Sequence, residues 1–327
     1  MSDVAALAQV SLKTVSRVVN GEPGVRPATA ARVHQAIAQL HFRRNDLARA
    51  LRQGQVSSTL GLVIENVSNP FFSAVTRGVE EVARSHGLLV IAGSSDEDPE
   101  RERNLLRLLC EQRVNGLLIV PAGADHRYLL PELLLGTPAV FIDRPPGHVK
   151  ADAVLLDNVG GARAAVEHLL AHGHRRIGIV GDALTIFTAA ERLRGYRDAL
   201  SARGVAFDPA LVRLGSHDAV AAEAATLDLL ALPHPPTALF AGNNRNTIGA
   251  LRALRSSSRR TALVGFDDFE LAELLPLPVT VIACDPVELG RQAAELCCRR
   301  LGGDDRPPQR VVLPTALVVR GSGEAAP

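Results

Sequence analysis

Apolar residues recur at helical spacing in two short stretches at the start of the chain. The first is residues 4–8, Val-Ala-Ala-Leu-Ala, and residues 9–10 make a tight break after it. Ser11 is a good N-cap for the second stretch, whose apolar face consists of Val15, Val18 and Val19. The opposite face presents side chains that can reach base edges or phosphates, namely Leu12, Lys13, Thr14, Ser16, Arg17 and Asn20. Two short helices joined by a tight turn are typical of a helix-turn-helix that reads DNA.

A third helix is predicted to close the core of this N-terminal domain. Pro27 suits a first helical position, although Arg26 stands where a Ser or Thr cap would be expected. Three apolar residues then recur at i, i+4 and i+7 to form the packing face, namely Val33, Ile37 and Leu40. We therefore expect a helix-turn-helix DNA-binding domain over residues 1–44.

Residues 45–58 predict a short helix followed by a tether. Asn45 can cap a helix over residues 46–52, which ends near Gly54. So short a helix is not stable alone in water, because nucleation costs more free energy than so few hydrogen bonds return. Its order must come from DNA or from a second copy of itself. The alternative is a plain linker in which Leu51 packs against the rest of the chain.

From residue 59 onward, short apolar runs alternate with stretches of helical spacing. The runs are Leu60–Ile64, Leu88–Ala92, Leu117–Val120, Ala139–Ile142, Ala153–Leu156, Ile177–Val180, Ala238–Ala241, Ala262–Phe266 and Val279–Ile282. The stretches with helical spacing include 71–86, 99–114, 159–172, 189–203 and 245–255. Strands that are apolar throughout and are separated by helices predict parallel sheets covered on both faces.

Residues 59–327 are too many for one such sheet, so we expect two doubly wound subdomains. The first is expected at about 59–157 and 286–313, and the second at about 158–285 and 314–327. The chain would then cross between them near Asp157–Gly161, Asp285 and Pro314. A cleft between two such subdomains is the natural site for a ligand.

Charge separates the two parts of the chain. Residues 1–60 carry eight basic and three acidic side chains, whereas the whole chain has a formal net charge of only +1. A basic N-terminal domain on a neutral-to-acidic body indicates that phosphate binding is confined to that domain. The alternative is that Lys13 and Arg17 belong to an ordinary solvated helix face.

The loops at the carboxyl ends of the predicted strands supply the candidate ligand groups. They are Asn66–Phe72, Ser94–Asp98, Pro121–Asp125, Asp143–Pro146, Asp182–Glu191, Asn243–Asn246 and Asp267–Phe269. These loops are rich in Asp, Asn and Arg, with a few aromatic residues. That mixture suits a polar, hydroxylated molecule such as a sugar or sugar acid.

The chain closely resembles the LacI/GalR family of bacterial transcription regulators. The matching segments are residues 3–5 (Asp-Val-Ala), 10–11 (Val-Ser), 14–20 (Thr-Val-Ser-Arg-Val-Val-Asn), 40–45 (Leu-His-Phe-Arg-Arg-Asn) and 48–51 (Ala-Arg-Ala-Leu). The resemblance continues over essentially the whole chain. It implies an all-α headpiece with a hinge helix, followed by an α/β, periplasmic-binding-protein-like core of two doubly wound parallel-sheet subdomains. One departure is that only Met1 and Ser2 precede Asp3, where the family usually carries a capping Thr or Ser.

The same resemblance assigns DNA-binding roles. Leu12 and Lys13 match the two positions that choose the operator sequence, and Thr14, Ser16, Arg17 and Asn20 match positions that contact bases or backbone. In the family, two hinge helices pair in the minor groove and a leucine from each wedges between base pairs. Leu51 matches that leucine, and Asn45 begins the hinge segment, so both join the DNA-binding set.

The resemblance also assigns effector-binding roles to Phe72, with Phe71 as second choice, and to Arg192, Asn243, Asp267 and His217. The alternatives are loop capping for Asn243 and Asp267, and an ordinary surface charge for Arg192. Two departures from the family leave the effector unspecified. The usual Asn-Asp pair is Asn243-Asn244, and the chain contains no Trp that could stack on a sugar.

Other chemistry lacks its motifs. His168 and His172 stand at i, i+4 on a predicted helix, but Gly173 ends that helix and leaves His174 in a turn, so we expect no metal site. There is no Gly-rich nucleotide loop and no G-x-S-x-G nucleophile motif. The four cysteines show no C-x-x-C spacing and are expected to be reduced, as in a cytoplasmic protein. No apolar run reaches the length of a membrane span.

We therefore expect a sequence-specific transcriptional regulator, a repressor rather than an enzyme, with no cofactor. Its expected partners are double-stranded DNA with a pseudo-palindromic operator, a small sugar-like effector, and itself as a homodimer, because one head reads one half-site. An activator or dual regulator of the same family is the first alternative. A solute-binding module of the periplasmic type, which would share the fold of the body, is the second.

Overall fold

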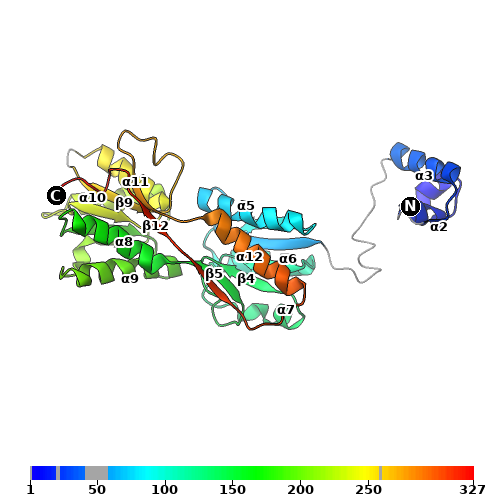
Figure 1. Ribbon diagram of the computed structural model, residues 1–327, viewed down its shortest axis with the longest axis horizontal. Helices are drawn as coiled ribbons and strands as arrows, with labels where there is room; N and C mark the ends of the chain where they lie inside the picture. Colours follow the sequence, from blue (N-terminus) through cyan, green and yellow to red (C-terminus); the bar gives the residue numbers. More distant parts are fainter. Residues whose placement is uncertain (1, 20–22, 41–57, 258–259) are drawn as a thin grey trace. The chain divides into compact units, whose positions relative to one another are not determined.

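The computed structural model describes residues 2–19, 23–40, 58–257 and 260–327 of the 327-residue chain. The chain forms two compact units, Met1–Ser57 and Ser58–Pro327, here called the head and the body. The head is helical, and Figure 1 shows strands flanked by helices in the body.

The head contains helices α1 (Ser2–Leu7), α2 (Leu12–Val19) and α3 (Pro27–Gln39). Its core is formed by small apolar side chains from all three helices, namely Val4, Ala5, Ala8, Val15, Val33 and Ala36. The predicted packing face of α3 is wrong at one position, since Leu40 is 43% exposed and the smaller Ala36 is buried. Because these side chains are small, the three helices must lie close together to form a packed core.

The ends of these helices follow the sequence closely. The backbone N–H of Thr14 donates to Ser11 Oγ at 3.1 Å, so Ser11 caps α2 as predicted. Gln9 has φ of 51° in the turn between α1 and α2, a left-handed conformation that breaks the helix there. Arg26 provides no side-chain cap for α3, which begins with Pro27 at its first position.

The body contains two six-stranded sheets. The first sheet has the order β11-β5-β4-β3-β1-β2, and the second has the order β12-β10-β9-β8-β6-β7. The strands of the first sheet are β1 (Thr59–Ile64), β2 (Leu89–Ser94), β3 (Gly116–Ile119), β4 (Ala139–Ile142), β5 (Asp152–Leu156) and β11 (Arg310–Leu313). Those of the second are β6 (Ile177–Gly181), β7 (Val212–Leu214), β8 (Ala238–Ala241), β9 (Ala262–Phe266), β10 (Thr280–Ala283) and β12 (Ala316–Val318). All neighbouring strands are parallel except β12, which pairs antiparallel with β10.

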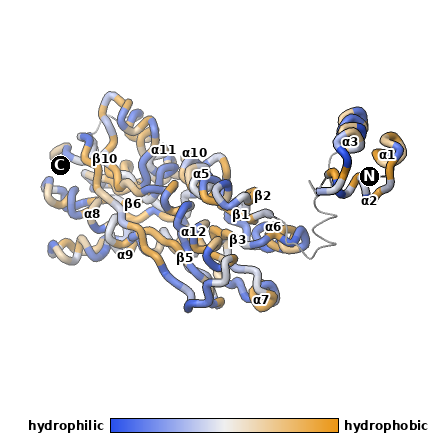
Figure 2. The backbone as a smooth tube through the Cα atoms, turned by 45° about the vertical axis from the view of Figure 1, so that its right-hand side comes forward, coloured by the Kyte–Doolittle hydropathy of each residue, from blue (hydrophilic) through white to orange (hydrophobic). Residues whose placement is uncertain are grey.

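Helices cover both faces of each sheet. They are α5 (Pro70–Ser85), α6 (Pro99–Glu111), α7 (Leu130–Leu134), α8 (Asn158–Ala171), α9 (Phe187–Ala202), α10 (Ala219–Leu230), α11 (Asn244–Arg255) and α12 (Pro286–Leu301), with short 3-10 turns at Arg127–Leu129 and Pro209–Leu211. Helices α5 and α12 cover one face of the first sheet, and α6 and α7 the other. Helices α8 and α9 cover one face of the second sheet, and α10 and α11 the other. In Figure 2, strands such as β5 are hydrophobic, whereas the helices around them alternate between hydrophobic and hydrophilic residues.

Helices α5 and α12 touch at two glycines. A Cβ atom on Gly78 would lie 1.9 Å from the carbonyl oxygen of Val287, and a Cβ atom on Gly290 would lie 2.0 Å from that of Val75. Both distances are far below van der Waals contact. The two helix backbones therefore approach so closely that only glycine, which has no Cβ atom, fits at these two positions.

The chain passes between the two sheets three times, at Asp157, at residues 284–285 and at residues 314–315. Each sheet therefore receives its last edge strand, β11 or β12, from the end of the chain. The carboxyl ends of the parallel strands carry most of the loops in which the sequence predicted ligand groups, and these loops also cap the following helices through Asn69, Asp98, Asp157 and Asn243.

Candidate functional site

The predicted reading face of the head lies at the start of α2. Leu12 is 55% exposed although it is apolar, and Lys13 is exposed beside it. Thr14, Ser16 and Arg17 are partly buried on the same helix. An exposed leucine next to an exposed lysine at a helix N-terminus suits contact with a thymine methyl group and a base edge or phosphate. Asn20, Asn45 and Leu51 lie outside the described residues.

Arg17 is tied to the turn that precedes α3. Its Nη2 donates to the carbonyl oxygen of Pro23 at 2.7 Å. Gly24 follows with φ of 96°, and a Cβ atom there would lie 3.0 Å from the same Nη2. Arg17 therefore helps to set the position of α2 relative to α3, in addition to the DNA contact that its sequence position predicts.

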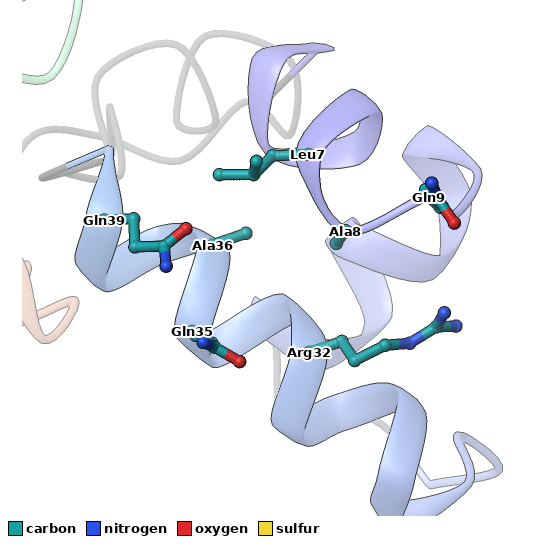
Figure 3. Close-up of a pocket in the computed structure, with 7 residues that line it drawn as sticks. All are labelled: Leu7, Ala8, Gln9, Arg32, Gln35, Ala36 and Gln39. Carbon is teal, nitrogen blue, oxygen red and sulfur yellow. The ribbon is translucent and has the colours of Figure 1, made fainter.

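A shallow hollow of about 220 Å³ lies between α1 and α3. Figure 3 shows its walls, formed by Leu7, Ala8 and Gln9 on one side and by Arg32, Gln35, Ala36 and Gln39 on the other. No residue of α2 lines it, so this hollow is separate from the predicted reading face.

In the body, a small cavity lies where loops from both sheets meet. It is lined by Glu65, Asn69, Glu97, Asp182, Ile186, His217, Asn243 and Arg245. Its volume is about 20 Å³, which is room for one water molecule. Of the predicted effector residues, Asn243 and His217 line this cavity. Glu65 and Arg245 were not singled out from the sequence, although Arg245 falls within a predicted ligand loop.

Two polar contacts cross the cleft directly. Arg245 Nη1 lies 3.1 Å from Glu65 Oε1, and Asn244 Nδ2 donates to Asn69 Oδ1 at 2.8 Å. Glu65 and Asn69 follow β1 of the first sheet, whereas Asn244 and Arg245 begin α11 beside the second sheet. The two subdomains are therefore held closed by their own side chains in this arrangement.

One side of the cavity is built by Asp182. Asn243 Nδ2 donates to Asp182 Oδ2 at 2.6 Å, and His217 Nδ1 lies 3.4 Å from Asp182 Oδ1. Asn243 Oδ1 also accepts the N–H of Asn246 at 2.7 Å and caps α11. The capping alternative for Asn243 is thus correct, and the same side chain also lines the cavity.

Arg192 is buried, so the surface-charge alternative for it is wrong. Only 6% of Arg192 is exposed, and its Nε donates to Asn158 Oδ1 at 2.8 Å. Its Nη1 donates to the carbonyl of Gly242 and lies 3.7 Å from Asp267 Oδ2. The guanidinium also stacks on Phe266, with its carbon 3.7 Å from the ring centroid.

Two buried carboxyl groups, Asp143 and Asp267, lie beside this arginine. Burial raises the pKa of Asp267 to about 6, with a further upward push from Asp143 and a downward one from Arg192. Burial also raises the pKa of Asp143, while Arg144 and Arg192 lower it. Oδ1 of Asp143 has no hydrogen-bond partner among the described residues. The sequence placed Asp143 in a candidate loop but did not single it out.

Phe71 and Phe72 lie in the first turn of α5, shortly after the cavity-lining Asn69. Both belong to the apolar core under α5, with their rings edge to face at 5.0 Å between centroids. They are 9% and 3% exposed, and neither lines the cavity in this arrangement. Contact of either ring with an effector remains a prediction.

Two acidic side chains that line the cavity have raised pKa values. Burial raises the pKa of Glu65 to about 7, with Glu97 and Asp182 pushing in the same direction and Arg245 and Arg144 opposing it. Burial likewise raises the pKa of Asp182, against the effect of His217 and Arg192. Glu65 and Asp182, like Asp143 and Asp267, therefore hold their protons more tightly than exposed carboxyl groups do.

The histidines near the end of α8 have structural partners. The ring of His168 packs against that of His172 at a tilt, with 4.5 Å between centroids, and its Nε2 contacts Glu324 Oε1. His174 is buried and contacts Thr237 Oγ1 at 2.9 Å. Within residues 2–19, 23–40, 58–257 and 260–327, no three His, Cys, Asp or Glu side chains are grouped as metal ligands. Over the same ranges, no helix has both the length and the apolar character of a membrane span.

Comparison with known proteins covers both units. A family model described as "Bacterial regulatory proteins, lacI family" matches residues 1–45, and one described as "Periplasmic binding protein-like domain" matches residues 166–323. The HTH-type transcriptional regulator CelR of Thermobifida fusca is 37% identical over 98% of this chain and 97% of its own length. A solved complex of the regulator CelR with cellobiose is 33% identical and has a TM-score of 0.74 over 98% of each chain. The lac repressor dimer bound to operator and the anti-inducer ONPF is 28% identical, with a TM-score of 0.84 over 99% of this chain and 98% of that one.

Proposed function

The chain belongs to the lacI family of bacterial regulatory proteins and is a helix-turn-helix transcriptional regulator, and from that premise we propose how it works. The head binds a pseudo-palindromic operator, and the body binds a sugar or sugar derivative in the cleft between its two sheets. Binding of that effector changes the affinity for operator. We propose that the protein is a repressor and has no enzymatic activity.

The observation that carries this proposal is the polar cavity between the strand ends of the two sheets. Ligands of open α/β sheets bind beyond the carboxyl ends of the strands, and the groups found there are carboxylates, amides and guanidinium groups. Such groups pair with hydroxyl donors and acceptors. The solved CelR–cellobiose complex supports a sugar as the ligand class.

The effector must enter by separating the two subdomains, because the cavity holds no more than one water molecule. Its access therefore requires the Arg245–Glu65 and Asn244–Asn69 contacts to open. We propose that this motion is passed to residues 45–52 and alters their order on DNA. The ligand shifts that balance only by its different affinity for the two arrangements, typically about 1–3 kcal/mol.

We further propose that the protein acts in the cytoplasm as a homodimer, since a two-fold operator needs two heads. Light scattering of the full-length protein tests this, and a stable tetramer or a monomer on DNA would contradict it. In the same proposal, Leu12, Lys13, Thr14, Ser16, Arg17, Asn20, Asn45 and Leu51 contact DNA.

The experiment that tests the function has two steps. Full-length protein is used to select its operator from random DNA, and the operator complex is then titrated with a panel of sugars. A repressor controlled by induction should lose operator affinity as the effector is added, and a promoter fusion should then show higher transcription. A gain in affinity would indicate co-repression, whereas higher transcription caused by the protein alone would favour an activator.

A further inference from the structure

The cleft contains more carboxylates than guanidinium groups. Among the described residues, the charged side chains that line the cavity or pair beside it are the acids Glu65, Glu97, Asp143, Asp182 and Asp267 and the bases Arg144, Arg192 and Arg245. His217 adds a further positive charge only when it is protonated. With every carboxyl group ionised and His217 neutral, the acids exceed the arginines by two charges.

Each of the three arginines is already engaged. Arg144 donates to both carboxylate oxygens of Glu97, and Arg192 is held by Asn158, Gly242 and Asp267. Arg245 pairs with Glu65 across the cleft. The carboxylates of Asp182 and Asp143 have no guanidinium of their own. Asp182 contacts the amide of Asn243 and the imidazole of His217. Asp143 lies 3.8 Å from Arg144, which is already paired with Glu97.

Three buried acceptor atoms beside the cleft have no hydrogen-bond partner among the described residues. They are Oδ1 of Asp143, Asn244 and Asn246, residues that are 4%, 3% and 0% exposed. Nε of Arg144 is a buried donor without a hydrogen-bond partner, but it lies 3.8 Å from Oδ2 of Asp143, beyond hydrogen-bond distance. An unpaired acceptor is unfavourable in a buried position. An ionised carboxylate and an amide oxygen are satisfied by a donor, and a carboxylate prefers a charged one.

From this geometry we propose that the effector is a cation, an amine-bearing polyhydroxyl compound rather than a neutral sugar or a sugar acid. This inference rests on the proposed function, in which a sugar-like effector fills the same cleft. The ammonium group supplies three donors and one positive charge to a cleft in which carboxylates outnumber guanidinium groups and buried acceptors are left unpaired. A carboxylate or phosphate on the ligand would add to the existing repulsion.

Arg245 then acts as a tethered competitor of the effector. Its guanidinium is 25% exposed and reaches from the first turn of α11 to Glu65, the carboxylate that an incoming ammonium would also contact. The effector replaces Arg245 at Glu65 and keeps the two subdomains bridged. Glu65 and Arg245, although they are partners in one ion pair, therefore have opposite effects on binding.

The test measures binding of matched hexoses to the full-length protein by calorimetry near neutral pH. Glucose, galactose and mannose are each compared with their amino sugars (amine at C2 or C6), N-acetylated amino sugars and uronic acids. In at least one series we expect the amine to bind about tenfold more tightly than its N-acetylated form, the ratio for one charge-assisted hydrogen bond.

Two variants of the ion pair sharpen this test. Glu65→Gln should reduce the preference for the amine about tenfold, whereas Arg245→Gln should increase the affinity for it. Glu100→Gln, at an exposed position on α6, serves as the control. If both variants weaken binding alike, the pair is only a structural clasp and the inference is wrong.

Two further outcomes separate this inference from the proposed function. An uncharged hexose or a uronic acid that binds at least as tightly as its amine overturns the inference and leaves a sugar-controlled regulator intact. Failure of every hexose and derivative to bind overturns both the inference and the proposed effector class.

Discussion

Asp143 and Asp267 occupy equivalent positions in the two sheets of the body. Asp143 directly follows β4 with φ of 67°, and Asp267 directly follows β9 with φ of 65°. Their backbone N–H groups donate to the next strand in the same way, to Val154 at 2.8 Å and to Ile282 at 2.9 Å. A left-handed backbone is uncommon outside glycine, so the repeated conformation marks both positions as functional candidates.

Replacing either aspartate by asparagine should weaken effector binding. Asparagine keeps the shape and tolerates the left-handed backbone, but it loses the charge that strengthens a hydrogen bond to the ligand. We expect Asp143→Asn and Asp267→Asn each to lower effector affinity about tenfold or more, while operator affinity without effector stays near the wild-type value. Titrations of ligand and of labelled operator measure the two quantities separately.

Asp228→Asn is the matched control for these variants, because Asp228 is exposed on α10 and lies outside the predicted ligand loops. It should leave both affinities unchanged. If the cleft variants instead lose operator binding and keep ligand affinity, the two aspartates are structural and the assignment of the cleft fails.

Specificity for operator should depend on Leu12 and Lys13. Changing both should redirect the preferred sequence, with each lost base contact weakening binding by about 1–3 kcal/mol and with little effect on non-specific affinity. Selection from random DNA measures the preference. Recovery of the same site by the double variant would show that other residues read the sequence.

Glu65 should make the stability of the protein depend on pH. Its pKa rises from 4.5 to about 7 on folding, so the folded state binds the proton more tightly than the unfolded chain does. Its contribution to stability is present at low pH and is lost as the pH rises toward 7. Glu65→Gln removes this loss of stability. The melting temperature of the variant minus that of the wild type should therefore be larger at pH 8 than at pH 5. A difference between the two proteins that does not change with pH would show that Glu65 is not shifted.

The contact between α5 and α12 should not tolerate a methyl group. Gly78→Ala or Gly290→Ala should destabilise the body by about 1–3 kcal/mol or more, because the added Cβ atom meets a backbone carbonyl that cannot move alone. Denaturant unfolding measures the change. Gly123→Ala is the control, since its Cβ atom would meet only the side chain of Pro99 at 3.4 Å, and equal losses in all three variants would contradict the argument.

The regular parts of the body could be predicted because their signal is local. Runs such as Leu60–Ile64 and Ala262–Phe266 lie within buried strands, and the predicted helix at 71–86 corresponds to α5. Strands β7, β11 and β12 are three or four residues long, lie at sheet edges and were not predicted, because runs this short do not distinguish an edge strand from a loop. Helix α10 is apolar on nearly all sides and gives no clear period.

The cleft was harder to predict because its groups meet only through the fold. Asn243 and His217 could be picked out by family position, and both line the cavity. Glu65 directly follows a strand and Arg245 lies in the first turn of a helix 180 residues later, so no spacing in the sequence relates them. The burial of Arg192 is likewise a tertiary effect, since its helix has charged residues on both sides.

The late arrival of β11, β12 and α12 has a consequence for synthesis on the ribosome. A nascent chain emerges from its N-terminus, and the head can fold once its three helices have left the exit tunnel. Five strands of the first sheet are complete at Leu156 and α5 already covers part of one face, but the part that α12 covers stays bare until residues 286–301 appear. Nascent body chains therefore expose part of an apolar sheet face during nearly half of translation, and that interval is when shielding by a chaperone matters most.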